Sequence, residues 1–223
     1  MWLFNSSIGR KVIMSVTGLC LILFLTFHMS MNVVALFSAE GYNMICELLG
    51  ANWYAVVATL GLAALAVIHI IYAFILTMQN KAARGSERYA VTEKPSKVEW
   101  ASQNMLVLGL IVLIGLALHL VNFWAKMMLV DLTGVGDLVH STDGAYWIKE
   151  TFSNGAYVVV YLIWIAALWF HLSHGFWSAL QTMGWNGKVW FTRWKIIGIA
   201  YVSLLCAGFA IVVLWFFFNS ICC

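Results

Sequence analysis

The stretch VIMSVTGLCLILFLTFHMSMNVVALF, residues 12–37, decides the fold, because it is apolar along its length and contains no Asp, Glu, Lys or Arg. It follows Arg10 and Lys11, as the apolar part of a secretory signal would. Such a signal has only about 7–15 apolar residues and ends at a small-residue cleavage site, which this run does not have. Since about 20 apolar residues span a bilayer, we expect residues 12–37 to form a retained transmembrane helix.

Four further segments have the same character, at residues 53–79, 103–130, 155–181 and 195–218. The whole chain is 63% hydrophobic and 9% charged, whereas soluble domains carry about 25% charged residues. Its single proline, Pro95, lies between two segments and leaves the helices uninterrupted. The sequence therefore predicts an all-α integral membrane bundle of five transmembrane helices, with residues 1–223 as a single membrane domain.

Lysine and arginine lie mostly on one side of this predicted bundle, by ten residues to two. Short loops rich in Lys and Arg stay in the cytoplasm. We therefore expect a cytoplasmic N-terminus, a C-terminus outside, and a location in the bacterial inner membrane. The basic side holds Arg10, Lys11, Lys81, Arg84, Arg88, Lys94, Lys97, Lys188, Arg193 and Lys195, and the other side holds Lys126 and Lys149 with Glu40, Glu47, Asp131, Asp137, Asp143 and Glu150.

Each of the first four segments carries one deeply placed histidine: His28, His69, His119 and His171. An ionisable residue inside a membrane is costly and points to a function. At 1.5 Å per residue, each histidine lies about 24 Å from the start of its helix. Because neighbouring helices run in opposite directions, we expect His28 and His119 in the outer half of the membrane, and His69 and His171 in the inner half.

A six-coordinate haem requires two axial imidazoles that face each other, and helix bundles build cofactor sites from such facing side chains. With both axial positions filled, the haem transfers electrons rather than binding oxygen. The sequence therefore predicts an outer haem b between His28 and His119 and an inner haem b between His69 and His171. Small residues near these ligands would leave room for the flat macrocycle, namely Gly61, Ala66, Gly115, Ala166 and Ala167.

Other interpretations of these histidines stay open. A transmembrane histidine can instead join two helices or relay protons, so a cofactor-free transporter is an alternative. A zinc site is disfavoured, because its ligands must meet at one point rather than in two layers. The cysteines form no CxxC motif, which argues against an iron–sulfur or zinc site in this chain. They are Cys20, Cys46, Cys206, Cys222 and Cys223.

Four further polar residues are candidates for contacts with a cofactor or with solvent. His174 lies one turn beyond His171, so it could replace that ligand or bond a haem propionate. His140, in the outer loop GDLVHSTDG, is expected to be solvated. Asn32 and Asn122 lie shortly after His28 and His119, and each is either a solvated helix end or a contact for a quinone headgroup.

Three stretches resemble the cytochrome b558 membrane subunit of succinate dehydrogenase and fumarate reductase, of the dihaem type with one five-helix anchor chain. They are SSIGRKVIMSVTGLCLILFLTFHMSMN, IHIIYAFILTMQNKAARGSERY and WFHLSHGFWSALQTMGWN. Each stretch contains a predicted haem ligand. The resemblance covers nearly the whole chain, although the loop 131–154 and the fifth segment carry little of it.

The resemblance implies two b haems held by His28, His69, His119 and His171. It favours His171 over His174, because the family pattern has a histidine thirteen residues before the glycine of the inner turn, which is Gly184 here. It also implies an FAD flavoprotein subunit and an iron–sulfur subunit on the cytoplasmic face. Menaquinone suits the dihaem relatives as the membrane electron carrier.

Glu47 lies in the outer loop where some relatives have an acidic residue beside the quinone, so it is the candidate for quinone protonation. The chain would then be the quinone-reactive electron-transfer subunit, with succinate or fumarate chemistry on a partner subunit. The alternatives are a haem-free proton-relay transporter and the cytochrome b anchor of a hydrogenase or formate dehydrogenase.

Overall fold

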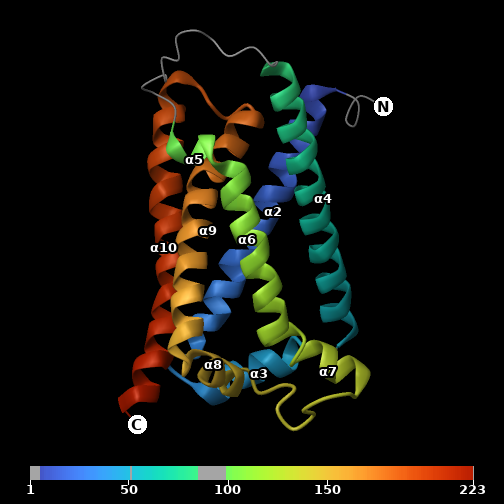
Figure 1. The fold of residues 1–223 in the computed structure, drawn as a ribbon, viewed down its shortest axis with the longest axis vertical. Coiled ribbons are helices and arrows are strands. Elements are labelled where there is room, and N and C mark those ends of the chain that lie inside the picture. Colours follow the sequence, from blue (N-terminus) through green and yellow to red (C-terminus); the bar gives the residue numbers. More distant parts are fainter. Residues whose placement is uncertain (1–5, 51, 85–98, 223) are drawn as a thin grey trace.

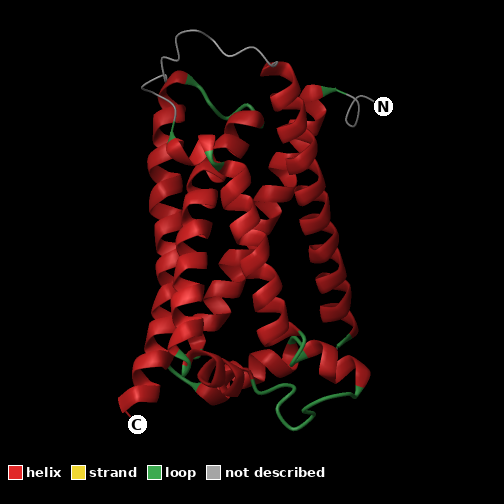
Figure 2. Ribbon diagram, in the orientation of Figure 1, coloured by secondary structure: helices red, strands yellow, loops and turns green. Residues whose placement is uncertain are grey.

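The computed structural model describes residues 6–50, 52–84 and 99–222. These residues form helices joined by loops, without a strand (Figure 2). Five helices are long and apolar enough to cross a membrane, which confirms the all-α, five-helix prediction. They are α2 (Ser7–Val34), α4 (Trp53–Arg84), α6 (Met105–His119) with its π-helical continuation η1 (Leu120–Trp124), α9 (Gly155–Thr182) and α10 (Lys188–Cys222).

The predicted roles of Pro95, Arg88, Lys94, Lys97 and Cys223 concern positions outside the described residues, as do the side chains of Arg84 and Cys222.

The long helices run side by side along the length of the molecule, and the two ends of the chain lie at opposite ends of it (Figure 1). An odd number of crossings requires this arrangement. The short helix α5 (Trp100–Gln103) lies at the end where α2 begins. At the other end, the loops carry three short helices that the sequence did not predict: α3 (Ala39–Leu48), α7 (Met128–Thr133) and α8 (Gly144–Phe152).

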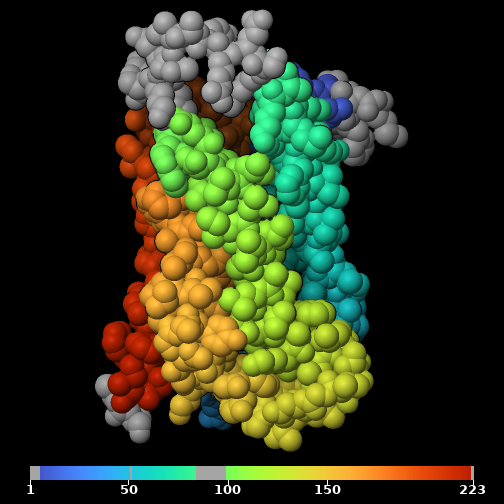
Figure 3. Space-filling view, viewed as in Figure 1, coloured from blue at the N-terminus to red at the C-terminus, as the bar shows by residue number. Residues whose placement is uncertain are grey.

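Helix α9 is the centre of the bundle, since it packs against α2, α6 and α10. The most deeply buried side chains, Val202 and Leu205, belong to α10 and are part of the same core. Helix α4 is peripheral: it packs mainly on α2, and its apolar segment has 0% of its residues buried inside the protein. Figure 3 shows α4 in teal at the edge of the molecule, beside α6 in green. Its exposed apolar side chains are suited to lipid.

The helix ends differ from those expected because capping groups, rather than hydropathy, decide where a helix begins and ends. Helix α2 begins at Ser7 rather than at residue 12, since the Ser6 hydroxyl accepts a hydrogen bond from the Gly9 amide at 2.9 Å. The third span ends at Trp124 rather than at about residue 130, because the chain leaves the helix after η1. The hydropathy pattern therefore predicts the apolar segment of each helix, but it does not predict how many turns the helix continues beyond that segment.

The loop helices α3 and α8 are joined by hydrogen bonds across one end of the bundle. Asn43 donates to the Asp143 carboxylate at 2.7 Å, and its carbonyl oxygen accepts from the Ala145 amide at 3.0 Å. A Cβ at Gly144 would lie 2.4 Å from the Cys46 sulfur, so only glycine allows this approach. Burial raises the pKa of the Cys46 thiol to about 11, which keeps it protonated at neutral pH.

Candidate functional site

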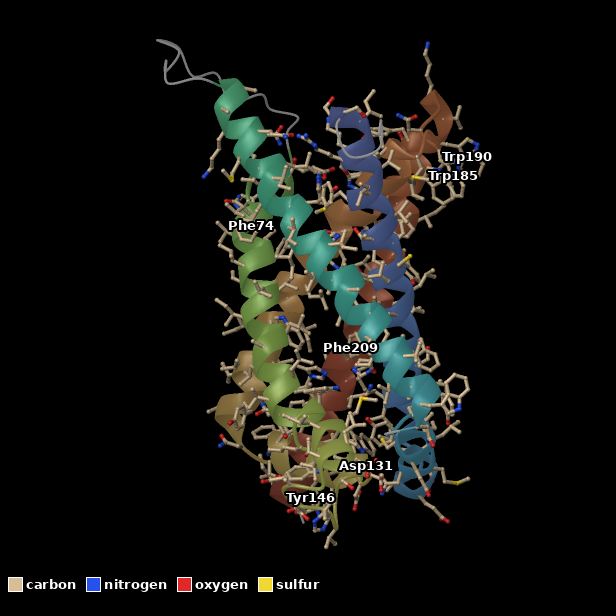
Figure 4. All side chains as sticks on the ribbon, turned by 90° about the vertical axis from the view of Figure 1, so that its right-hand side faces the viewer. Phe74, Asp131, Tyr146, Trp185, Trp190 and Phe209 are labelled. Carbon is tan, nitrogen blue, oxygen red and sulfur yellow. The ribbon has the colours of Figure 1, made fainter. Side chains whose placement is uncertain are left out.

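The first pair of histidines joins α2 to α6. The ring centroids of His28 and His119 are 5.7 Å apart and nearly perpendicular. Phe209 of α10 lies beside this pair, with its ring 5.9 Å from that of His28. In Figure 4, Phe209 lies in the half of the molecule that ends in Asp131 and Tyr146, so this pair belongs to the half capped by α3, α7 and α8.

The second pair joins α4 to α9 in the opposite half. The ring centroids of His69 and His171 are 6.4 Å apart. Phe74, which follows His69 on α4, lies towards the end that carries Trp185 and Trp190 (Figure 4). The structure therefore brings the four histidines together as the two pairs expected from their depth. Among residues 6–50, 52–84 and 99–222, no three His, Cys, Asp or Glu residues gather around one point that could hold a metal ion.

The spacing within each pair fits an iron atom between two imidazoles. Two metal–nitrogen bonds of about 2 Å each place the ring centroids roughly 6 Å apart, close to the observed 5.7 and 6.4 Å. In each pair, one ring has a buried Nδ1 with no hydrogen-bond partner, in His119 and in His171. A buried polar atom without a partner costs about 1–3 kcal/mol. The donor set and the ring spacing both fit a haem.

Aromatic side chains enclose the His28–His119 pair. Phe24 stacks on His28 at 5.5 Å, while Phe123 and Trp164 lie 5.0 and 5.7 Å from His119. These rings exclude water and supply a low-dielectric wall. The His69–His171 pair has a different environment, because glycines of the neighbouring helices face the two rings. A Cβ at Gly18 would lie 3.2 Å from Cε1 of His69, and one at Gly109 would lie 3.6 Å from Cε1 of His171.

Sequence reasoning missed Gly18 and Gly109, as well as Thr17, whose hydroxyl lies 3.2 Å from Nδ1 of His69. Depth along the helix could have identified Thr17 and Gly18. They lie in the first half of α2, and His69 lies in the second half of the antiparallel helix α4, so all three belong to the half of the bundle where α2 begins.

The predicted small residues have different surroundings. A Cβ at Gly115 would lie 2.0 Å from the Trp164 indole, so this glycine accommodates a side chain rather than a macrocycle. Gly61 has nothing within 4 Å of such a Cβ and remains open. Ala167 is buried, whereas Ala166 is exposed on the surface of the bundle. The expectation for Gly115 is therefore wrong, because the bulky neighbour that fills the space comes from another helix.

His174 is engaged outside the pair. Its Nδ1 lies 3.4 Å from the Glu99 carboxylate, which also accepts from Lys195 at 2.6 Å. Partial burial alone would raise the pKa of Glu99, but the hydrogen bonds from Lys195 and His174 lower it below its usual value. Glu99 is thus an anion at neutral pH, and it is a hydrogen-bond partner of His174, whereas the ring in contact with His69 is that of His171. This geometry favours His171 as the partner of His69.

Asn32 and Asn122 are bonded to protein groups, so neither is a solvated helix end. Asn32 donates to the His28 carbonyl oxygen at 2.7 Å and accepts from the Tyr42 hydroxyl at 3.1 Å. Its amide also lies 3.4 Å from Nε2 of His28, a weaker contact. Asn122 is buried in η1 and donates to the Tyr161 hydroxyl at 3.2 Å.

The π-helical turn η1 begins directly after His119, where the Ala125 amide donates to the Leu120 carbonyl at 2.7 Å. Single π-turns inside helices occur often at functional sites, because they change the direction of the side chains that follow. Here the turn places Asn122 against Tyr161 while His119 faces His28. It also leaves Nε1 of Trp124 buried without a partner among the described residues.

The remaining candidates lie in the loops at the α3–α8 end. His140 is not simply solvated: it stacks on Tyr146 at 4.0 Å, and its Nδ1 lies 2.9 Å from Asp137. The hydrogen bond with His140 lowers the pKa of Asp137 below its usual value. Glu47 lies in the last turn of α3 and its side chain is exposed. The described contacts do not bring Glu47 to the histidines.

Comparison of the chain with protein-family models, with curated proteins and with solved structures found no match.

Proposed function

We propose that this chain is a dihaem cytochrome b membrane anchor of a succinate:quinone oxidoreductase, which carries electrons between a cytoplasmic iron–sulfur subunit and membrane quinone. The observation that carries this proposal is the pairing of four histidines from four helices into two layers. Each layer has the ring spacing of bis-imidazole iron. A proton relay would not require the rings to be paired in this way.

Bound haem would supply reversible one-electron transfer in each layer. His28 and His119 would hold the outer haem, and His69 and His171 the inner one. The chain's own residues orient these imidazoles and exclude water from them. The two layers lie in opposite halves of the bundle, one towards the end with α5 and one towards the end with α3 (Figure 4), so the proposed path runs across the bilayer rather than along its surface.

The end of the bundle where α2 begins suits a soluble partner of opposite charge. In the described residues, this end carries Arg10, Lys11, Lys81, Lys188 and Arg193. We place it in the cytoplasm on the Lys/Arg asymmetry. The iron–sulfur subunit would dock there and carry, with the flavoprotein, the succinate and fumarate chemistry. Quinone, with menaquinone favoured, would then react near the outer pair, since otherwise the outer haem would have no electron donor or acceptor beyond the inner haem.

The test of this proposal is a reduced-minus-oxidised optical spectrum of the purified complex, together with identification of its subunits. We expect α and β bands of two haem b components, and an FAD and an iron–sulfur subunit in the complex. A complex without haem would favour the proton-relay transporter. Haem with hydrogenase or formate dehydrogenase subunits would reassign the soluble partner and leave the haem sites in place.

Replacement of His174 by alanine is expected to leave both haem components at full occupancy. His174 contacts Glu99 rather than His69, so its loss removes a hydrogen bond near the surface and no iron ligand. The measurement is haem content per protein and the optical spectrum of His174→Ala. Loss of the inner component in this variant, with retention in His171→Ala, would reassign the ligand to His174.

Replacement of Glu47 by glutamine tests the proposed quinone site. Quinone reduction takes up two protons with two electrons, so a carboxylate near the outer surface would serve proton exchange. We expect Glu47→Gln to lower quinone-linked turnover by about 10²-fold or more, while dye-linked turnover at the soluble subunits and both haem spectra persist. Glu40→Gln is the matched control, since Glu40 is also exposed on α3. Equal quinone turnover in the two variants would remove Glu47 from the mechanism.

Reporter fusions test the proposed orientation. A reporter placed in the segment 85–95 should be active only as a cytoplasmic enzyme, and one placed after Cys223 only as an exported enzyme. The physical reason is the retention of Lys- and Arg-rich loops in the cytoplasm. If the reporter in 85–95 behaved as exported and the one after Cys223 as cytoplasmic, the orientation would be the reverse of the proposed one. Both haem layers would then be inverted relative to the soluble subunits, which would contradict the proposed electron path.

A further inference from the structure

We infer that Thr17 is a positioning residue that sets the tautomer and basicity of His69, and thereby lowers the reduction potential of the inner haem. This inference rests on the proposed function, because it concerns the group that His69 would bind. It assigns a role to a residue of α2, which holds no inner-layer ligand of its own.

The direction of the hydrogen bond between the two side chains follows from the partners of Thr17. Its hydroxyl donates to the carbonyl oxygen of Ile13 at 2.8 Å and also lies 3.1 Å from that of Met14. A hydroxyl has one hydrogen, which is therefore committed to the backbone of α2. With its hydrogen on the backbone, the Thr17 oxygen accepts from the ring of His69, whose Nδ1 lies 3.2 Å away. This arrangement assigns the proton to Nδ1 of His69.

A proton on Nδ1 leaves Nε2 of His69 with a free lone pair, which is the electron pair that binds iron. Partners that accept a hydrogen bond from the other ring nitrogen of a metal-bound histidine fix its orientation and raise its basicity. A more basic ligand stabilises ferric iron more than ferrous iron, so it lowers the reduction potential. His171, the other member of the pair, has an Nδ1 without a partner. Of the two axial histidines, only His69 therefore has a side-chain hydrogen bond among the described residues that would tune the reduction potential of the inner haem.

The same contact also orients helix α4. This helix is peripheral and packs mainly on α2, so few contacts define its rotation. Thr17 is 5% exposed, which places the hydrogen bond inside the α2–α4 interface. The adjacent Gly18 has no Cβ, and this allows the His69 ring to lie close against α2. Thr17 and Gly18 together position the His69 ring: Thr17 through its hydroxyl and Gly18 through the space left by its missing side chain.

The experiment compares Thr17→Val, which replaces the hydroxyl by a methyl group, with Thr17→Ser, which keeps the hydroxyl. The matched control is Thr26→Val on the same helix. The Thr26 hydroxyl also donates to a backbone carbonyl, that of Ile22, but its side-chain partner is Tyr201 rather than a histidine. The readout is a redox titration of both haem components in the purified complex, together with their low-spin electron paramagnetic resonance spectra.

We expect Thr17→Val to lower the ferric-to-ferrous ratio of the inner haem at a fixed potential by about three- to tenfold, where tenfold corresponds to ~59 mV. The outer component should be unchanged, and Thr17→Ser should restore the wild-type inner potential. Loss of the inner haem in Thr17→Val with retention in Thr17→Ser would also support the role of the hydroxyl.

Three results would overturn the inference. The first is an inner potential in Thr17→Val that equals the wild type. The second is an equal shift in Thr17→Val and Thr17→Ser, which would assign the effect to packing. The third is an equal shift of the inner component in Thr26→Val. In each of these the wild type still binds two haems, so the proposed function stands. A wild-type complex without haem would instead overturn the proposed function and this role with it.

Discussion

Replacement of His69 or His171 by alanine is expected to abolish one haem b component completely, and replacement of His28 or His119 to abolish the other. Each layer offers two imidazoles, so a single substitution would remove half of the axial ligands of the proposed haem iron in that layer. The buried ring that remains would have no counterpart on the facing helix. The measurement is the haem content of each variant and the number of one-electron steps in a redox titration.

The pattern across the four variants is more informative than any one loss. His28→Ala and His119→Ala should give the same residual spectrum, and His69→Ala and His171→Ala should share the complementary one. His140→Ala is the control, because His140 lies in the loop before α8, against Asp137 and Tyr146. Loss of the same haem component in His28→Ala and His69→Ala would contradict the pairing of His28 with His119 and of His69 with His171.

Replacement of Gly115 by alanine is expected to destabilise the bundle and to disturb the outer haem. The added Cβ would lie 2.0–2.3 Å from three atoms of the Trp164 indole. That indole is held in place by its Nε1, which donates to the Val112 carbonyl at 3.0 Å. Overpacking of this kind costs about 1–3 kcal/mol. Since Trp164 lies 5.7 Å from the His119 ring, its displacement should also lower the occupancy of the outer component.

The control for this substitution is Gly175→Ala in α9, where a Cβ would meet nothing within 4 Å. Alanine is favoured over glycine in a helix interior by about 1 kcal/mol, so this control should be neutral or slightly stabilising. The measurement is the thermal unfolding temperature of the complex in detergent, together with the haem content. Equal unfolding temperatures for the Gly115→Ala and Gly175→Ala variants would contradict the close contact between α6 and α9.

The loops and the helix ends were the parts of the fold that the sequence described least well. Hydropathy indicates how much of a helix lies in lipid, but the ends of α2 and α8 are decided by the caps Ser6 and Asp143. The helices α3 and α8 are short and amphipathic, and they are stable because they pack on each other and on the bundle. Their contacts join residues about a hundred positions apart, such as Asn43 and Asp143.

The sequence by itself determined the five spans and the grouping of the histidines into two layers, because rise per residue and apolar length are local properties of a helix. Depth follows from counting along the chain, so His28 could be matched with His119 and His69 with His171 before their distances were known. Only the tertiary structure decided what surrounds each ring. The rotation of each helix about its axis depends on its neighbours, and that rotation places Thr17 against His69 and Trp164 against Gly115. The position of Glu99, just before α5, likewise depends on the packing of that segment and brings its carboxylate to His174.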